Sequence, residues 1–223
     1  MGIRLPGWVW IGAITLSAMA GLVNVVGFLG FEHQALSHVS GSTSQLGIAL
    51  ATGDWRAVGH LWGLLIAFSA GAMLSGLIIQ NESLQLGRRY GVALALESLL
   101  LMAAIPLFKQ QQIWGAFAAA MACGLQNALA TTFSGTVIRT THLTGMYTDL
   151  GIALGHMLRG LPLQTRRMLL SSLIISGFLV GGIAGAWLFL RWHYDALWAP
   201  ALLIGLTGLS YAIYQQWRRT RPD

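Results

Sequence analysis

Charged residues are scarce in this chain. Asp, Glu, Lys and Arg make up only 9% of its 223 residues, whereas 55% of the residues are hydrophobic. A soluble domain usually carries about 25% charged residues. Because so few charges cannot cover a water-facing surface, the composition excludes an ordinary soluble enzyme and a disordered protein. It indicates an integral membrane protein.

Cysteine and common enzyme motifs are also missing or rare. The single cysteine, Cys123, excludes an intrachain disulfide framework. The sequence has no Walker A motif, no Gly-x-Ser-x-Gly and no His-Glu-x-x-His, so an ATPase, a serine hydrolase and a zinc protease have no support. Two matched histidines and scattered carboxylates do not supply the converging ligands that a metal needs. We therefore expect no enzymatic activity, no cofactor and no metal site.

Apolar stretches long enough to cross a bilayer dominate the chain. A crossing takes about 20 residues of helix. The sequence has six apolar stretches, and only the third has a charge in its interior, Glu97. It therefore predicts an all-α integral membrane protein with one membrane domain over 1–223. The expected transmembrane helices cover about 8–31, 58–80, 89–108, 112–134, 167–190 and 197–217.

Basic residues indicate the orientation of these six helices. The formal net charge is +6, but the Lys and Arg residues lie at the edges of apolar runs and form no patch, so nucleic acid is not an expected partner. Because basic residues gather on the cytoplasmic side of a membrane, we expect both termini in the cytoplasm. The expected inner segments hold Arg4, Arg88, Arg89, Arg139, Arg159, Arg166, Arg167, Arg218, Arg219 and Arg221, and the outer ones hold Arg56, Lys109 and Arg191.

Two segments of the chain match each other. Residues 38–50 align with 142–154, and seven of the 13 positions are identical, beginning with His38 and His142. Upstream, Gly21-Leu-x-Asn24 matches Gly124-Leu-x-Asn127. Polar matches in register indicate a repeat, with one copy over about 8–108 and the other over about 112–217. Each copy has three spans, and an odd number inverts the second copy relative to the first, as in many transporters.

A short segment follows each His-x-[Ser/Thr]-Gly motif. Residues 42–52 would form a helix about 16 Å long, roughly half the hydrocarbon thickness. This length suits a half-helix or re-entrant segment, and an amphipathic linker at each interface is the alternative. If the two segments enter from opposite sides, their first N–H groups and hydroxyls meet at a polar site near the midplane.

The candidate site consists of polar residues and glycines from both copies. The asparagines serve either as hydrogen-bonding contacts within the bundle or as substrate contacts. The histidines bond the first turn of the following helix, contact substrate or titrate near neutral pH. The candidates are Asn24, His38, Ser40, Gly41, Thr43 and Gln45 in the first copy, and Gln126, Asn127, His142, Thr144, Gly145 and Thr148 in the second.

Two acidic residues are candidate coupling groups. A carboxylate inside a span, as at Glu97, is costly and marks a functional site by default. Glu97 is either a proton-coupling group or a hydrogen-bonding partner between helices. Asp149 stands in the second motif at the position of Gln45. It either pairs with Arg139 or neutralises a cationic ligand.

These motifs resemble those of a known family. Residues 39–47, 124–128, 140–145 and 148–151 look like the YoaK family of bacterial inner-membrane proteins, which is defined by a domain of unknown function. The resemblance covers nearly the whole chain and implies a six-helix protein of the bacterial inner membrane, but it supplies no substrate. Members often have Asp where Asn24 stands and Asn where Ser42 stands, which removes a charge from the first copy here.

A membrane protein with this repeat is expected to move a small solute. We expect a secondary transporter that carries a small molecule or ion by alternating access around the polar site. A channel whose re-entrant segments form a filter and a non-transporting scaffold or sensor are the alternatives. The lipid bilayer is an expected partner. Gly71-x-x-x-Ser75 and Gly181-x-x-x-Gly185 favour close helix contacts, either within the chain or in a homodimer.

Overall fold

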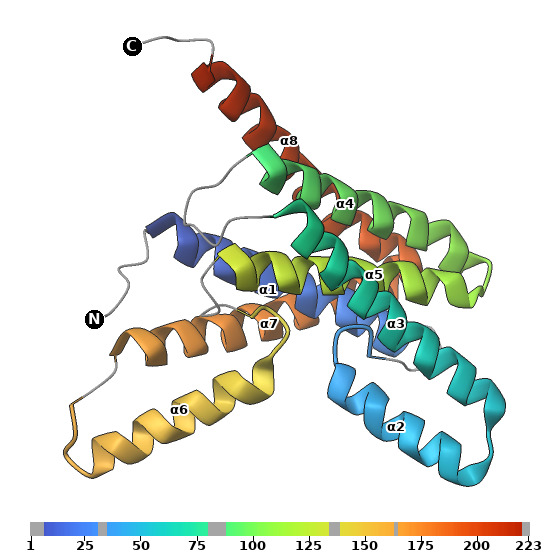
Figure 1. Ribbon diagram of the computed structural model, residues 1–223, viewed down its shortest axis with the longest axis horizontal. Coiled ribbons are helices and arrows are strands. Elements are labelled where there is room, and N and C mark those ends of the chain that lie inside the picture. The colour runs from blue at the N-terminus through green and yellow to red at the C-terminus, as the bar shows by residue number, and fades with distance from the viewer. Residues whose placement is uncertain (1–6, 31–34, 80–87, 134–138, 163–164, 220–223) are drawn as a thin grey trace.

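All regular structure in the described part of the chain is helical (Figure 1). The computed structural model describes residues 7–30, 35–79, 88–133, 139–162 and 165–219. In chain order the elements are α1 (Gly7–Leu29), α2 (Val39–Thr52), α3 (Trp55–Ile78), α4 (Arg88–Lys109), α5 (Ile113–Phe133), α6 (Leu143–Leu158), α7 (Thr165–Trp192), the 3₁₀ turn η1 (His193–Leu197) and α8 (Trp198–Arg219).

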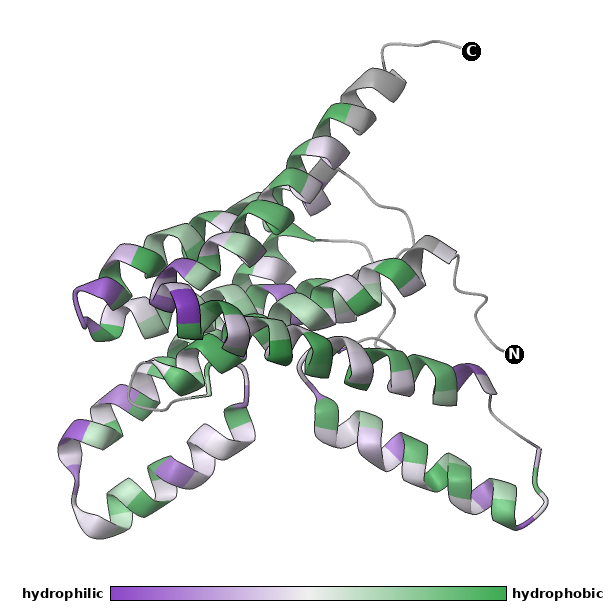
Figure 2. Ribbon diagram, turned by 180° about the vertical axis from the view of Figure 1, so that it is seen from behind, coloured by the Kyte–Doolittle hydropathy of each residue, from purple (hydrophilic) through white to green (hydrophobic). Residues whose placement is uncertain are grey.

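Five stretches are long and apolar enough to cross a membrane, and they make the chain a multi-pass membrane protein. The fifth is 49 residues long and contains α7, η1 and α8. Many large apolar residues of these helices are exposed, and hydrophobic residues recur along their ribbons (Figure 2). The five stretches are Trp10–Leu29, Trp55–Ile78, Arg89–Lys109, Ile113–Thr132 and Thr165–Ile213.

The predicted span limits agree with the helix limits to within a few residues. The long helices α1, α3, α4, α5, α7 and α8 each correspond to one predicted span. Residues 31, 80 and 134, at which three of the predicted spans end, lie outside the described residues, as do Arg4 and Arg221. The segment after the first His motif begins three residues earlier than expected, at Val39, and the matching helix of the second copy begins at Leu143.

The long helices pack closely as α1 with α7, α3 with α5, and α4 with α8, and α4 also packs on α5 (Figure 1). The first pair is parallel, because Ile14 lies against Gly177 and Leu22 against Gly185. The second pair is also parallel. The third pair is antiparallel, since the Ser98 hydroxyl near the middle of α4 donates to the Ala201 carbonyl early in α8, at 2.7 Å, whereas Gly91 lies beside Gly208.

Glycine brings the backbones of α1 and α7 into direct contact. A Cβ atom added to Gly181 would overlap the carbonyl oxygen of Ala18. A Cβ atom added to Gly21 would overlap the carbonyl oxygen of Phe178. Only hydrogen fits at these two positions, so the crossing depends on both glycines. Small residues of this kind let helices in a membrane approach closely enough for packing forces to hold them.

The same contact recurs between α3 and α5. A Cβ atom on Gly71 would overlap the carbonyl oxygen of Met121, and one on Gly124 would overlap that of Phe68. Gly124 is the residue that matches Gly21 in the sequence alignment of the two copies. Phe68 stands three residues before Gly71, as Phe178 does before Gly181. The two crossings are therefore built from corresponding residues.

The short helices α2 and α6 pack on the long helices that follow them, α3 and α7. They begin close to each other near the middle of the molecule and run towards opposite sides of it (Figure 1). With 14 and 16 residues they are about 21 and 24 Å long, shorter than a hydrocarbon core of about 30 Å. Neither helix is among the stretches able to span a membrane.

A tight turn joins α2 to α3. Gly53 ends α2 in the left-handed conformation, with φ of 74°, which glycine adopts without strain. The next residue, Asp54, caps α3, because its carboxylate accepts a hydrogen bond from the Ala57 N–H at 3.0 Å. Leu46 of α2 then packs with Val58 of α3 in a small apolar cluster. The turn and the cluster hold α2 against α3.

We predict that Gly71→Ala destabilises the protein, because the added methyl group would overlap the backbone of α5. The expected loss is about 1–3 kcal/mol, as for other overpacked sites. Gly76→Ala on the same helix is the matched control, because no described atom lies within 4 Å of a Cβ atom there. Thermal unfolding of both variants in detergent checks the difference. Equal unfolding midpoints for the two variants would show that the crossing needs no glycine.

Candidate functional site

Asn24 holds the chain segment that leads into α2. The Asn24 Oδ1 atom accepts hydrogen bonds from the Ser37 N–H at 3.1 Å and from the Ser37 hydroxyl at 2.9 Å. Both residues are buried. Asn24 therefore supports the start of α2 from within α1, as a structural hydrogen-bonding partner, and it does not line the cavity described below.

Asn127 makes the corresponding contact in the second copy. Its Oδ1 atom accepts a hydrogen bond from the Thr141 N–H at 3.4 Å, and Thr141 stands directly before His142 as Ser37 stands before His38. Each asparagine thus ties the residue that precedes the matched histidine to a long helix. This hydrogen bond is repeated in the two copies, although the bond at Asn127 is longer.

The matched histidines stand at the N-caps of α2 and α6, but neither side chain makes a capping hydrogen bond in the described structure. The first N–H groups that bond back along the helices are those of Ser42 and Met146, which reach the His38 and His142 carbonyls. The N–H groups before them have no acceptor within their helix. Both helix starts therefore offer backbone donors, together with the positive end of the helix dipole.

The two helix starts line one cavity of about 600 Å³. This volume lies within the range of small-molecule sites. Motifs that are 104 residues apart in the sequence thus meet at one place. The lining residues are Ser37, His38, Val39, Ser40, Phe68, Asn127, Ala128, Thr131, Thr132, Arg139, Thr141, His142, Leu143 and Thr144.

His38 and His142 differ in their surroundings. The His38 ring packs edge-on against Phe178 of α7, with 5.6 Å between centroids. His38 lies outside the five apolar stretches, and burial lowers the pKa of its imidazole, which keeps it neutral at pH 7. The His142 ring instead folds over the first turn of α6, where a Cβ atom on Gly145 would come within 2.6 Å of its Nδ1 atom. Gly145 therefore makes room for this ring.

The predicted site residues fall into two groups. His38, Ser40, Asn127, His142 and Thr144 line the cavity, and the others do not. The Thr43 hydroxyl donates to the Val39 carbonyl at 2.8 Å, and the Thr148 hydroxyl donates to the Thr144 carbonyl at 2.9 Å, so both bond the preceding turn of their own helix. The predicted residues outside the lining are Asn24, Gly41, Thr43, Gln45, Gln126, Gly145 and Thr148, with Glu97 and Asp149.

Glu97 lies on α4, in the interior of the bundle. Its side chain is 2% exposed and is hydrogen-bonded to Gln126 of α5, while its Oε2 atom has no partner in the part of the chain described. The hydrogen bond between helices that the sequence suggested is therefore present. Neither Glu97 nor Gln126 lines the cavity, although Asn127, which follows Gln126 on α5, does.

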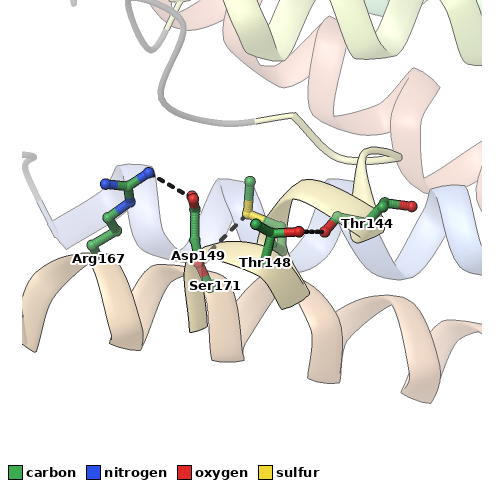
Figure 3. A network of polar contacts seen from close by, with 6 residues as sticks. Thr144, Thr148, Asp149, Arg167 and Ser171 are labelled. Carbon is green, nitrogen blue, oxygen red and sulfur yellow. Dashed lines mark hydrogen bonds and ion pairs between the residues drawn. The ribbon is translucent and has the colours of Figure 1, made fainter. Parts of the chain in front are cut away.

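Asp149 pairs with Arg167, and the expected pairing with Arg139 is wrong. An oxygen of the Asp149 carboxylate lies 2.6 Å from Nη2 of Arg167 at the start of α7 (Figure 3). The Ser171 hydroxyl lies 3.7 Å from the Met146 sulfur in the same interface. The α6–α7 hairpin brings Asp149 to α7, so the ion pair holds these two helices together.

Several lining residues did not emerge as candidates from the sequence. Ser37 and Thr141 hold matching positions before the histidines, and that match was a signal that could have identified them. Arg139 was considered only as a partner of Asp149. Phe68, Thr131 and Thr132 lie in apolar spans, where residue type alone does not reveal a cavity. Among the described residues, no group of three His, Cys, Asp or Glu side chains is placed to hold a metal ion.

Apolar helices around this polar cavity define a multi-pass α-helical membrane protein. The chain matches the family described as "Protein of unknown function (DUF1275)" over residues 12–210, and it belongs to that family. The resemblance to the YoaK family is consistent with this match. No curated protein and no solved structure matches the chain.

We predict that Asn24→Ala costs more stability than Asn127→Ala. The first substitution leaves two buried donors of Ser37 without an acceptor, which typically costs about 1–3 kcal/mol each. The second removes one longer hydrogen bond and is expected to cost about 1 kcal/mol. Thermal unfolding of the two matched variants checks the order. A larger loss for Asn127→Ala would show that the Ser37 contacts do not stabilise the start of α2.

Proposed function

We propose that the protein is a secondary transporter of the bacterial inner membrane, and that it carries a small solute through the cavity between α2 and α6. The observation that carries the proposal is the convergence of the two matched motifs on one cavity, with His38 and Ser40 from one copy and His142 and Thr144 from the other. Polar sites formed between repeats at broken or short helices are a recurrent feature of transporters.

Six spans in a 3+3 inverted repeat account for the helix directions. Successive spans alternate in direction, so spans 1 and 5 are parallel, spans 2 and 4 are parallel, and spans 3 and 6 are antiparallel. The pairs α1–α7, α3–α5 and α4–α8 have these directions if α2 and α6 do not cross the membrane. The stretch Thr165–Ile213 is then two spans, since its 49 residues are about twice the length of a crossing.

In this arrangement α2 and α6 are re-entrant half-helices from opposite sides of the membrane. The basic residues place both termini in the cytoplasm, so α2 enters from the outside and α6 from the inside. Backbone ends at membrane depth are tolerated where they line a water-filled cavity. The cavity of about 600 Å³ at the two helix starts meets that requirement.

Alternating access requires that the two half-helices open in turn. The α2–α3 hairpin is held by an apolar cluster, whereas the α6–α7 hairpin also has the Asp149–Arg167 ion pair. Because different contacts hold the two hairpins, we infer that one can open while the other stays closed. Glu97 is the proposed proton-coupling group, because its partner Gln126 precedes a lining residue on the same helix.

A channel is the alternative function. It would have the same polar site but would let solute through without alternation between the two sides.

A cysteine-accessibility experiment tests the shared cavity. In a Cys123→Ala background, single cysteines at Ser40 and Thr144 are expected to react with a membrane-impermeant thiol reagent, and each is expected to react from both sides of the membrane. Modification of one position is expected to slow the reaction at the other. Met73→Cys is the control, because Met73 is 65% exposed on the apolar outer face of α3 and would lie in lipid.

An interfacial position of the two short helices predicts a different labelling result. If α2 and α6 lie at the two interfaces, Ser40→Cys reacts only from the outside and Thr144→Cys only from the inside, with no mutual protection. That result would remove the basis for transport through this cavity. Simultaneous, rapid access from both sides in every molecule would instead favour a channel.

A further inference from the structure

We propose that the cavity binds a small oxyanion, either a carboxylate or an inorganic oxyanion such as sulfate or phosphate. This inference rests on the proposed function for the movement of the solute, and on the cavity itself for the binding. Three features of the cavity support it: the charge of its described lining, the two helix starts and the hydroxyl of Thr141.

The charge of the lining is one-sided. Arg139 is a permanent cation, and none of the described residues that line the cavity is Asp or Glu. The nearby carboxylate of Asp149 is already paired with Arg167 at 2.6 Å. The Glu97 carboxyl lies within the bundle, outside the lining, and is bonded to Gln126. Among the described lining residues, therefore, no group would balance a cationic solute.

Two helix N-termini lie at the same cavity. The N–H groups of Val39, Ser40, Leu143 and Thr144 lie before the first bonded N–H of each helix, and all four residues line the cavity. Each helix start carries roughly half a positive charge. Because neither His38 nor His142 caps its helix with its side chain, these donors are available to a ligand. Donors of this kind bind anions.

The hydroxyl of Thr141 is a further donor at the cavity. Thr141 is 7% exposed and lines the cavity. Its N–H is bonded to Asn127. An oxyanion in the cavity would provide an acceptor for this hydroxyl and for the guanidinium of Arg139, whose planar donors suit a carboxylate or sulfate.

Thermal unfolding of the purified full chain in detergent tests the binding. Sodium acetate, sodium sulfate and sodium phosphate are titrated separately, with sodium chloride holding the ionic strength constant. At least one of the three oxyanions is expected to raise the unfolding midpoint in a saturable way, because a ligand that binds only the folded state stabilises it. Choline chloride and glycerol, a cation and a neutral solute, are expected to leave the midpoint unchanged.

Variants of Arg139 locate the site. Arg139→Gln is expected to raise the apparent Kd of the active anion about tenfold or more, which is the usual effect of removing a charged hydrogen-bond donor. Arg139→Lys keeps the charge and is expected to have a smaller effect. Thr141→Val, which removes only the hydroxyl, is expected to weaken binding as well. Arg159→Gln is the control, because Arg159 is a basic residue outside the cavity lining and is expected to bind as the wild type does.

Three outcomes would overturn the inference: stabilisation by none of the three anions, stabilisation by choline or glycerol in their place, or wild-type affinity in Arg139→Gln. Uptake of the same radiolabelled anions into proteoliposomes separates this inference from the proposed function. Binding without uptake would contradict transport and leave the anion site standing. Uptake of a neutral solute or a cation without anion binding would contradict the anion site and leave transport standing.

Discussion

Direct contact between helix backbones at glycine is the constraint on which the rest of the structure depends. In lipid, apolar side chains gain little by leaving one partner for another, so close packing has to hold the helices together. Gly21 and Gly181 join α1 to α7, and Gly71 and Gly124 join α3 to α5. These crossings fix the long helices that carry Asn24 and Asn127, and so they determine where the two short helices begin.

The two asparagines connect these long helices to the candidate site through hydrogen bonds. Asn24 and Asn127 each stand three residues after a crossing glycine and hold the residue before a matched histidine. As a result α2 and α6 start near the middle of the molecule and run to opposite sides (Figure 1). A polar cavity at their starts follows from this geometry, because free N–H groups in an apolar bundle need water, protein or a ligand as partners. In the proposed function, the transported anion is such a ligand.

Much of the fold could be predicted from the sequence, because backbone groups in lipid must be bonded within helices and long apolar runs therefore mark them. The matching of the two His motifs and of Asn24 with Asn127 also identified five of the fourteen residues that line the cavity. The rest depends on tertiary structure. The Asp149–Arg167 pair forms because a hairpin brings α6 back to α7. Because Asp149 pairs with Arg167, Arg139 remains as a cation in the cavity lining. Phe68 lines the cavity because its helix crosses α5 at Gly124.

The central claim is that two inverted copies bring their short helices into the membrane from opposite sides. Topology reporters inserted after Thr52 and after Gly160, at the ends of α2 and α6, measure this most directly. The account predicts that the reporter after Thr52 lies outside the cell and the reporter after Gly160 lies in the cytoplasm. Reporters on the same side of the membrane would contradict the inverted repeat and the site built upon it.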